Sequence, residues 1–288
     1  MTQNGPTGLV YFDMLDREIA RDTQGFDGST IRAAKQYDAF GRVSQTSRPY
    51  FLASGTPQWT TYSYDGLSRV VTMTLPDGSV TQTAYHGLSI TETNALSQTR
   101  TVTKNSQDQV VAVTDALGHT MSRAYDPFGN MTQTTDAVGN VVSATYDVRG
   151  RKLTSTDPDM GYWTYSYNTL GQMVSQTDAK GQVTSITYDK LDRVVQRVEA
   201  DMTSVWTYDT AANGIGKLAS ASITAGPGAG FQRSASYDTL GRSVQVATTI
   251  DGTTYAMAAT YDANSRLSTV AYPSGFTAKY AYNNLGYA

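Results

Sequence analysis

The sequence predicts an all-β protein, an antiparallel array of β-hairpins that curls into a spiral shell or a barrel-like wall. Two observations carry this prediction. The 288 residues include 20 Tyr and 25 Gly, only 16% are charged, and the polar remainder is mainly Thr, Ser, Gln and Asn. Such a composition is typical of strands. The second observation is a repeat whose units each hold two turn signals between short alternating runs, with no convincing helical periodicity.

The repeat is clearest in the middle of the chain. Tyr125, Tyr146, Tyr167 and Tyr188 follow one another at intervals of 21 residues, and each begins a motif of the form Tyr-Asp-x-x-Gly-Arg or a close variant. A second turn signal, Asp-Ala-x-Gly at residues 136–139, recurs between the motifs. Two turns and two short runs per unit predict an antiparallel meander.

The motif residues are expected to form the turns. The Asp carboxylate can accept hydrogen bonds from backbone N–H groups two residues further on, which initiates a turn. The Gly supplies the positive φ that a short hairpin loop with a bulge requires. We assign to this structural motif Tyr37, Asp38, Gly41, Arg42, Tyr64, Asp65, Tyr125, Asp126, Gly129, Tyr146, Asp147, Gly150, Tyr167, Gly171, Tyr188, Asp189, Tyr237, Asp238, Gly241 and Arg242.

The runs between the turns alternate as strands do. Thr184, Ile186 and Tyr188 are expected to share one face of a strand. We interpret the recurring tyrosines as structural packing, with hydroxyls that reach a partner at the rim of the sheet or water. The arginines that follow the motif glycine are expected to pair with aspartates of neighbouring turns; examples are Arg42, Arg151 and Arg242.

The number of repeats determines the expected architecture. About a dozen units give about 24 strands, and a flat sheet of that size would be ~115 Å wide. Open sheets rarely exceed ~10 strands without curling or splitting, so we expect curvature. We treat residues 1–288 as a single array, most regular over 115–200, looser over 1–114 and 201–288, and truncated at both ends.

A truncated meander leaves two strand edges that invite association. We expect these edges at residues 11–12 and 280–282. Either the chain forms dimers or larger assemblies through them, or irregular segments such as residues 47–60 cover them.

Composition also excludes several classes of protein. The chain has no Cys, which rules out a disulfide scaffold, Cys-ligated zinc and a thiol nucleophile. A formal net charge of −3 gives no electrostatic signature of nucleic-acid binding. No stretch approaches 18 uninterrupted apolar residues, so we expect no membrane span, and the first residues lack the features of a signal peptide.

We expect no catalytic, cofactor-binding or metal-binding residues. The abundant Asp residues suggest the hypothesis of a catalytic carboxylate pair for glycoside hydrolysis, but almost all of them occupy turn positions. His86 and His119 are expected in turns of different repeats, without the spacing of metal ligands. Residues 214–217, Gly-Ile-Gly-Lys, lack the first glycine of a phosphate-binding loop.

Carbohydrate binding is the alternative that the residues leave open. Exposed aromatic rings stack on sugars, and three tryptophans near turn regions are candidate glycan contacts: Trp59, Trp163 and Trp206. Aromatic residues in alternating strands more often serve as cross-strand packing pairs.

The recurring Tyr-Asp-x-x-Gly-Arg motif resembles that of the Rhs/YD-repeat family, over residues 12–286. Residues 37–43 and 136–140 are similar to consensus units, and residues 208–218 to a long-turn variant. The resemblance implies a β-shell that encloses a C-terminal toxin polypeptide, in bacterial polymorphic toxins and insecticidal toxin complexes, and a similar barrel in teneurins.

On this resemblance we expect a non-catalytic wall segment of a larger exported protein, secreted or at the cell surface. Its expected partners are a toxin polypeptide and the remaining shell of the parent protein. The family's self-cleaving C-terminal core has no match here, and residues 157–161, Asp-Pro-Asp-Met-Gly, occupy an ordinary turn position. The alternative function is a cell-surface module that recognises a carbohydrate or a protein.

Overall fold

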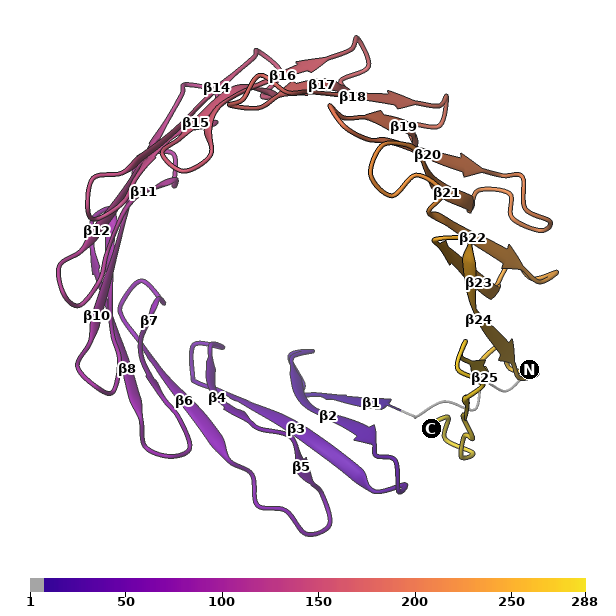
Figure 1. Cartoon of the computed structure of the whole chain (residues 1–288). Helices are drawn as coiled ribbons and strands as arrows, with labels where there is room; N and C mark the ends of the chain where they lie inside the picture. Colours follow the sequence, from indigo (N-terminus) through magenta and orange to yellow (C-terminus); the bar gives the residue numbers. More distant parts are fainter. Residues whose placement is uncertain (1–7) are drawn as a thin grey trace. The chain divides into compact units, whose positions relative to one another are not determined.

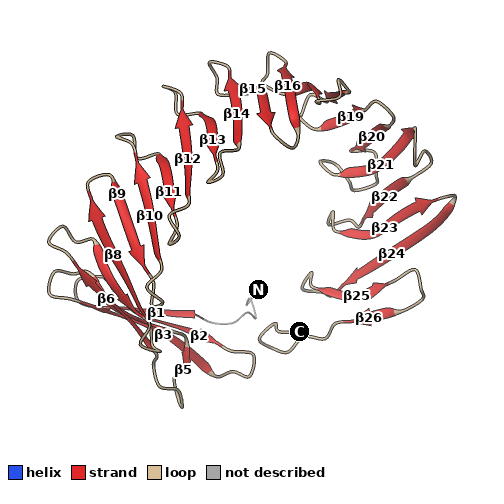
Figure 2. Ribbon diagram, turned by 60° about the vertical axis from the view of Figure 1, so that its left-hand side comes forward, coloured by secondary structure: helices blue, strands red, loops and turns tan. Residues whose placement is uncertain are grey.

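The computed structural model describes residues 8–288, which contain 26 strands and no helix. All the strands belong to one sheet, and strand pairs along the chain are antiparallel. Short turns connect strands that alternate in direction, so strands that are consecutive in the chain pair with each other (Figure 1, Figure 2). The exception is the strand at residues 50–51, which pairs with Ile31 and Arg32, so that the strands at 43–47 and 59–64 pair directly. This architecture confirms the predicted all-β hairpin array.

The chain divides into two compact units. The first unit holds the chain up to Tyr125 with Thr134–Asn140 and Tyr282–Ala288, and the second holds Asp126–Gln133 and Val141–Ala281. The first unit contains β1 (Gly8–Phe12), β2 (Glu18–Gln24), β3 (Thr30–Tyr37), β4 (Val43–Ser47), β5 (Tyr50–Phe51), β6 (Trp59–Tyr64), β7 (Val70–Thr74), β8 (Val80–His86), β9 (Ser89–Thr93), β10 (Thr99–Lys104), β11 (Val110–Thr114) and β12 (Thr120–Tyr125).

The second unit consists of the strands that follow. Strand β13 (Met131–Thr135) is divided between the units. The second unit then contains β14 (Val141–Tyr146), β15 (Lys152–Asp157), β16 (Gly161–Tyr167), β17 (Met173–Thr177), β18 (Val183–Tyr188), β19 (Val194–Val198), β20 (Thr203–Tyr208), β21 (Leu218–Ala225), β22 (Gln232–Tyr237), β23 (Ser243–Ile250), β24 (Thr253–Tyr261), β25 (Leu267–Ala271) and β26 (Thr277–Lys279).

The motif turns have the predicted hairpin geometry. In the turn between β3 and β4, the Asp38 N–H donates to the Arg42 carbonyl at 2.8 Å, and the Gly41 N–H donates to the Asp38 carbonyl at 3.0 Å. Gly41 has a φ of 80°, and the pairing register shifts at Tyr37. The turn is therefore a short loop closed by a bulge, and only a left-handed residue fits its fourth position.

Five turns on this edge place a residue other than glycine at this left-handed position. Asp16, Ser68, Asp108, Asp192 and Ser265 adopt φ values between 60° and 67°. Asp enters this region more readily than most residues, whereas Ser fits it less well. The turn geometry therefore imposes the backbone conformation even where the sequence departs from glycine.

The two faces of the sheet differ in composition. In β18, Thr184, Ile186 and Tyr188 are half-buried on one face, whereas Val183, Ser185 and Thr187 are exposed on the other, as the alternation predicts. We call the first the tyrosine face and the second the threonine face. On the threonine face, hydroxyls pair across neighbouring strands, as in Thr145–Thr154, Thr260–Thr269 and Thr91–Thr101 at 2.7–2.9 Å.

The sheet has almost no enclosed core. Among the residues that the structure describes, only Ala20, Asp22, Gly25, Gly214 and Ala219 are buried, and no large side chain is fully enclosed. A second layer of structure normally covers the apolar face of a sheet. In each unit the strands therefore depend on their backbone ladders, on cross-strand side-chain pairs and on the turns.

Two segments depart from the expectations. Residues 47–60 do not pair with either of the two terminal edges expected to need cover: β5 pairs instead with β3, where Ile31 and Arg32 face Phe51 and Tyr50. His86 ends β8 and faces Ser89, so this degenerate motif forms a two-residue turn rather than the Asp turn. Strand β1 pairs with β2, and β26 with β25. Self-association through these strands stays a prediction.

Gly118 tests the cost of the left-handed position, because its φ is +84° and a Cβ there would meet no atom within 4 Å. Gly118→Ala is expected to lower the free energy of unfolding by about 1 kcal/mol through backbone strain alone. The matched control is Gly66→Ala, where the space is equally open but φ is not positive. Gly66→Ala is expected to raise the free energy of unfolding slightly. Equal urea midpoints for the two variants would contradict this account.

Candidate functional site: the motif rim

The motif turns lie along one end of the strands. Because the strands alternate in direction, the turns that follow every second strand share an edge, which we call the motif rim. Its members begin at the Asp or Asn that follows each motif position, as at Asp38, Asp65, Asp147 and Asn168. The rim is the most regular constellation of polar side chains in the chain.

The aspartate of each turn is held by its own turn. In the turn after β18, Asp189 Oδ1 accepts hydrogen bonds from the N–H groups of Leu191 and Arg193 at 2.8 and 3.0 Å. Asp189 Oδ2 accepts one from Arg193 Nε at 2.7 Å. Both carboxylate oxygens are thus engaged locally. Matching sets occur at Asp38, Asp65, Asp147, Asp238 and Asp262.

The expected pairing of each arginine with an aspartate of a neighbouring turn is therefore wrong for most turns. Arg42, Arg151 and Arg242 form ion pairs with the aspartate four residues earlier, in their own turn. The closed hairpin places its first residue, the aspartate, beside its fifth residue, the arginine, so the two side chains meet within one turn. Arg193 does both, since it also binds Asp209 of the next turn at 2.6 Å.

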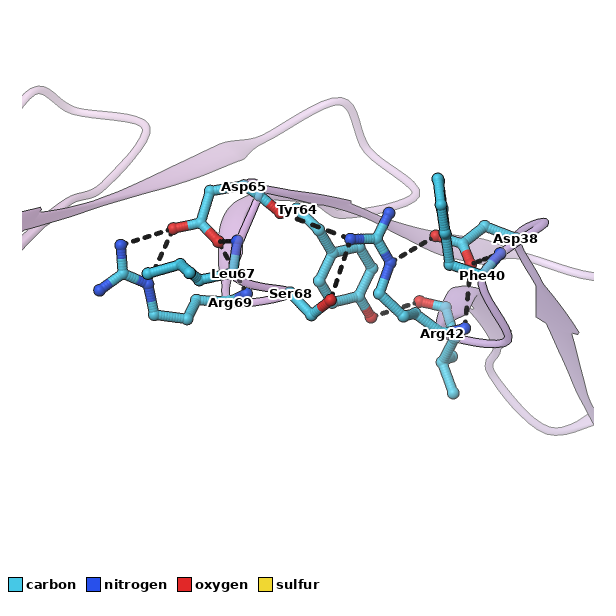
Figure 3. Close-up of polar contacts among 9 residues, drawn as sticks. Asp38, Phe40, Arg42, Tyr64, Asp65, Leu67, Ser68 and Arg69 are labelled. Atoms are coloured by element: carbon cyan, nitrogen blue, oxygen red, sulfur yellow. Dashed lines mark hydrogen bonds and ion pairs between the residues drawn. The ribbon is translucent and has the colours of Figure 1, made fainter.

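Each arginine also reaches forward to the next repeat. The Arg42 guanidinium lies 4.5 Å from the ring centroid of Tyr64, and its Nη1 donates to the Asp65 carbonyl and to Ser68 Oγ at 3.4 Å (Figure 3). A guanidinium over an aromatic ring gains a cation–π attraction. The same stacking joins Arg17 to Tyr37, Arg69 to Tyr85, Arg151 to Tyr167, Arg193 to Tyr208 and Arg242 to Tyr261.

The motif tyrosines link each repeat to the one before it. The Tyr188 hydroxyl donates to the Met173 carbonyl at 2.9 Å, and Met173 is the first residue of β17 after the preceding motif turn. Equivalent bonds of 2.6–3.1 Å join Tyr37 to Glu18, Tyr64 to Val43, Tyr85 to Val70, Tyr125 to Val110, Tyr146 to Met131, Tyr167 to Lys152, Tyr237 to Leu218 and Tyr261 to Ser243.

This tyrosine–carbonyl link supplies the rim partner expected for the hydroxyls. Where the preceding turn ends in arginine, the tyrosine ring contacts that arginine and the hydroxyl binds the backbone just after it, as at Tyr64. The turns before Tyr125, Tyr146 and Tyr188 end in Gln109, Asn130 and Gln172, and there the hydroxyl link is made without the stacking. Sequence reasoning did not identify the arginine–tyrosine stacking. The one available signal was the co-occurrence of Arg at the end of one motif and Tyr at the start of the next.

The rim hydrogen bonds shift the aspartate acidities. The side-chain bond from Arg193, followed by backbone N–H bonds from Arg193 and Leu191, holds the pKa of Asp189 below its ordinary value of 3.8. At Asp147 the backbone N–H of Arg151 and then its side chain lower the pKa. Asp209 and Asp189 together raise the pKa of Arg193. The rim aspartates are therefore ionised and occupied at neutral pH.

A second ion pair lies on the threonine face of the first unit. Asp22 is only 5% exposed and accepts hydrogen bonds from Arg32 Nε and Nη2 at 2.7 and 2.8 Å. The Arg32 guanidinium lies 5.0 Å from the ring centroid of Tyr11. The bond from Arg32 lowers the pKa of Asp22. The sequence signal was a pair of opposite charges flanking one turn, which sequence reasoning missed.

The three tryptophans do not form one platform. All lie within strands rather than at turns, and none is fully exposed. Trp163 and Trp206 share the tyrosine face, but four strand spacings separate β16 from β20, which is about 19 Å. Trp59 begins β6 in the first unit, on the threonine face. The Trp163 indole N–H already donates to the Met160 carbonyl at 2.9 Å.

The residues named as unlikely metal ligands remain apart. His119 Nδ1 lies 3.2 Å from Asp115 Oδ2 in a single turn, where it replaces the arginine of the motif. Over residues 8–288, no group of three or more His, Asp or Glu side chains is placed to hold a metal ion. Gly216 N–H donates to Asp209 Oδ1 at 2.6 Å, so the Gly-Ile-Gly-Lys segment closes a long turn.

The tyrosine face of the second unit contains an apolar groove. It has a volume of about 330 Å³ and crosses β23, β24 and β25. Val246, Tyr255, Met257 and Val270 line it, and Arg233 lies at its side. Tyr255 and Met257 remain 49% and 43% exposed. The groove is thus an accessible apolar surface on the wall of the sheet.

The tyrosine–carbonyl link predicts a measurable stability term. Tyr188→Phe removes the hydroxyl that binds the Met173 carbonyl and is expected to lower the free energy of unfolding by about 1 kcal/mol. Tyr162→Phe is the control, since Tyr162 lies on the opposite face of β16 from Tyr167 and is 54% exposed. Tyr162→Phe is expected to leave the free energy of unfolding unchanged. Chemical denaturation that shows equal losses would refute a specific role for the rim hydroxyl.

The lowered pKa values of the turn aspartates predict that the stability of the fold decreases in acid. A carboxyl whose folded pKa lies below its unfolded value of 3.8 stabilises the fold above that value and loses this contribution as pH falls through the folded pKa. The free energy of unfolding is therefore expected to fall below about pH 4.

Asp136→Asn tests the source of this acid sensitivity. Hydrogen bonding by Asn140 lowers the pKa of Asp136. Asn168 forms the same turn with its amide oxygen, so the variant keeps the geometry. Urea unfolding should show a lower midpoint at pH 7, where the ionised carboxylate of the unsubstituted protein contributes, and a shallower decline in acid. An identical decline in both proteins would exclude the turn carboxylate.

Comparison with known proteins gives three findings. The RHS Repeat family matches residues 105–141, 125–159, 146–183 and 167–203. No curated relative matches the sequence. The crystal structure of TcdB2-TccC3-TEV superposes with a TM-score of 0.79 at 15% identity, over 98% of this chain and 18% of that chain. The Photorhabdus luminescens Tc holotoxin pore gives 0.78 at 15% identity, over 97% and 18%.

The match covers the same tyrosine and aspartate positions that build the motif rim. The structural likeness extends over almost the whole chain, although the chain spans only about a fifth of the length of those structures. Residues 105–203 thus match the RHS Repeat family, and the chain as a whole shares its fold with part of the TcdB2-TccC3 structures.

Proposed function

We propose that this chain is a wall segment of an Rhs-type β-shell that encloses a toxin polypeptide for export and delivery. The observation that carries the proposal is the single-layer sheet of RHS repeats, whose two faces both stay accessible and which encloses almost no core of its own. A sheet with this construction acts as a partition, because it separates two spaces without filling either of them.

The polar and apolar groups support a structural role. The rim carboxylates are engaged by their own turns, which leaves them unsuited to general acid–base work. The half-exposed apolar side chains of the tyrosine face, including the groove of β23–β25, offer non-specific contacts to an unfolded polypeptide. The parent protein is proposed to be exported; residues 8–288 contain no helix that is long and apolar enough to cross a membrane.

The similar structures support the same proposal at the level of fold. Those structures are TcdB2-TccC3 assemblies, and this chain corresponds to 18% of their length. Under the proposal, the rest of the parent protein supplies further wall and the enclosed polypeptide. Carbohydrate recognition is the less favoured function, because the tryptophans do not form a common platform and the Trp163 N–H is already bonded.

Protease protection tests enclosure. The natural reading frame that contains this chain is expressed whole, and the purified protein is treated with a non-specific protease before and after denaturation. A segment outside the repeats is expected to survive in the native protein and to be digested after denaturation. Equal digestion in both states, or a reading frame without any segment beyond the repeats, would overturn the proposal.

A glycan array tests the alternative. Under the wall proposal, the purified chain is expected to bind no glycan on the array. Binding that is lost in Trp163→Ala or Trp206→Ala would instead establish carbohydrate recognition through these rings, with Tyr162→Phe as a control on the opposite face of β16.

A further inference from the structure

The motif rim of the second unit carries a continuous row of exposed apolar side chains. Successive motif turns between Asp126 and Arg242 each present one aliphatic or aromatic residue at the tip. We call this set the apolar rim row, and each member is 68–87% exposed: Phe128, Val148, Leu170, Leu191, Ile215 and Leu240.

The row persists although the turns differ. Where the usual position holds Arg149, the apolar residue is the preceding Val148, and in the long turn that ends at Lys217 it is Ile215. A turn tip in water normally carries polar residues or glycine. With 68–87% of their surface exposed, these side chains bury little apolar area against the strands of the second unit.

The turns hold the row in a fixed arrangement. The N–H groups of Phe128, Leu170, Leu191 and Leu240 each donate to the side-chain oxygen of the turn Asp or Asn at 2.8–3.0 Å. The backbone from which each side chain projects is therefore anchored before any partner binds. Such pre-organisation lowers the conformational entropy that association costs.

The period of the row identifies its partner. Adjacent members are two strands apart, so they repeat at about 10 Å along the rim. A partner that contacts every member must present apolar groups at the same interval. The motif rim of a second copy of this chain has that interval by construction, and two-fold pairing of identical surfaces is the commonest form of self-association.

The electrostatics of the rim are compatible with this pairing. The aspartates next to the row are matched by their own arginines, at 2.6 Å for Asp147–Arg151 and 2.7 Å for both Asp189–Arg193 and Asp238–Arg242. Two rims can therefore approach without a large uncompensated charge. An anionic membrane is a poorer partner for the same reason, since the rim has no excess of positive charge.

We propose that this chain self-associates rim to rim, through the apolar rim rows of two copies. Six members at about 10 Å make a narrow contact about 50 Å long. An interface of this kind lies near the lower limit for specific association, on the order of 1,000 Å² in total, so the dimer is expected to be weak and reversible. The contact uses turn tips and is distinct from pairing through the open strands β1 and β26.

Sedimentation equilibrium of the 288-residue chain tests the proposal. The unsubstituted protein is expected to show a reversible monomer–dimer equilibrium. The double substitution Leu170→Lys with Leu191→Lys should raise the dissociation constant at least tenfold. Lys180 occupies the equivalent position of another turn, with its N–H bonded to Asp178 Oδ1 at 2.9 Å, so the turn accepts lysine.

The matched control lies on the opposite rim. Leu96 and Leu117 have the same turn environment and are 78% and 81% exposed. Leu96→Lys with Leu117→Lys should change the dissociation constant less than twofold. An equal effect of both pairs, a dimer that survives the Leu170/Leu191 substitutions, or a monomer at every concentration would overturn the proposal.

Cross-linking gives an independent readout. The chain has no Cys, so a single introduced thiol reacts alone. Leu191→Cys should yield covalent dimers with a short bismaleimide, whereas Leu117→Cys should not. Co-flotation with phosphatidylcholine vesicles, lost in the Leu170/Leu191 variant while the protein stays monomeric, would assign the row to a membrane instead.

Discussion

The absence of a core makes the turn aspartate the centre of this structure. In the motif turns that begin with Asp and end with Arg, such as Asp189–Arg193, one carboxylate joins two backbone N–H groups to the arginine, and that arginine lies over the tyrosine of the next repeat. Without a second layer to fix the register of the strands, the register must come from the turns and from the links between them. The positive φ at the fourth turn position and the bulge at the tyrosine also belong to the turn, and they help to fix the strand register.

The same constraint explains why the two faces of the sheet carry different side chains. The tyrosine face carries the rings and aliphatic groups that join repeats, and the threonine face carries short hydroxyl pairs that join neighbouring strands. Neither face is closed off from its surroundings. A partition with two accessible faces of different chemistry suits a protein whose proposed role is to separate one polypeptide from everything outside.

Sequence reasoning predicted what depends on short spacing and missed what depends on contacts between repeats. The Asp-x-x-Gly turn, the bulge at Tyr188 and the face shared by Thr184 and Ile186 follow from local rules. The stacking of Arg42 on Tyr64 and the paired Asp22 and Arg32 depend on cross-strand register, which a one-dimensional pattern does not encode. Residues 47–60 read as irregular because β5 is only two residues long.

The hydroxyl of a motif tyrosine ends on the carbonyl of the first residue after the preceding motif turn, 15 residues back at Tyr167 and Tyr188, and this has a genetic consequence. Removal or duplication of a whole 21-residue unit from the regular region leaves every remaining hydroxyl opposite an equivalent carbonyl. Length changes between the two partners are also accommodated outside this region, since the link spans 18 residues at Tyr261 and 19 at Tyr237. Recombination between repeats can therefore change the size of such a wall in whole hairpins while its joints are preserved.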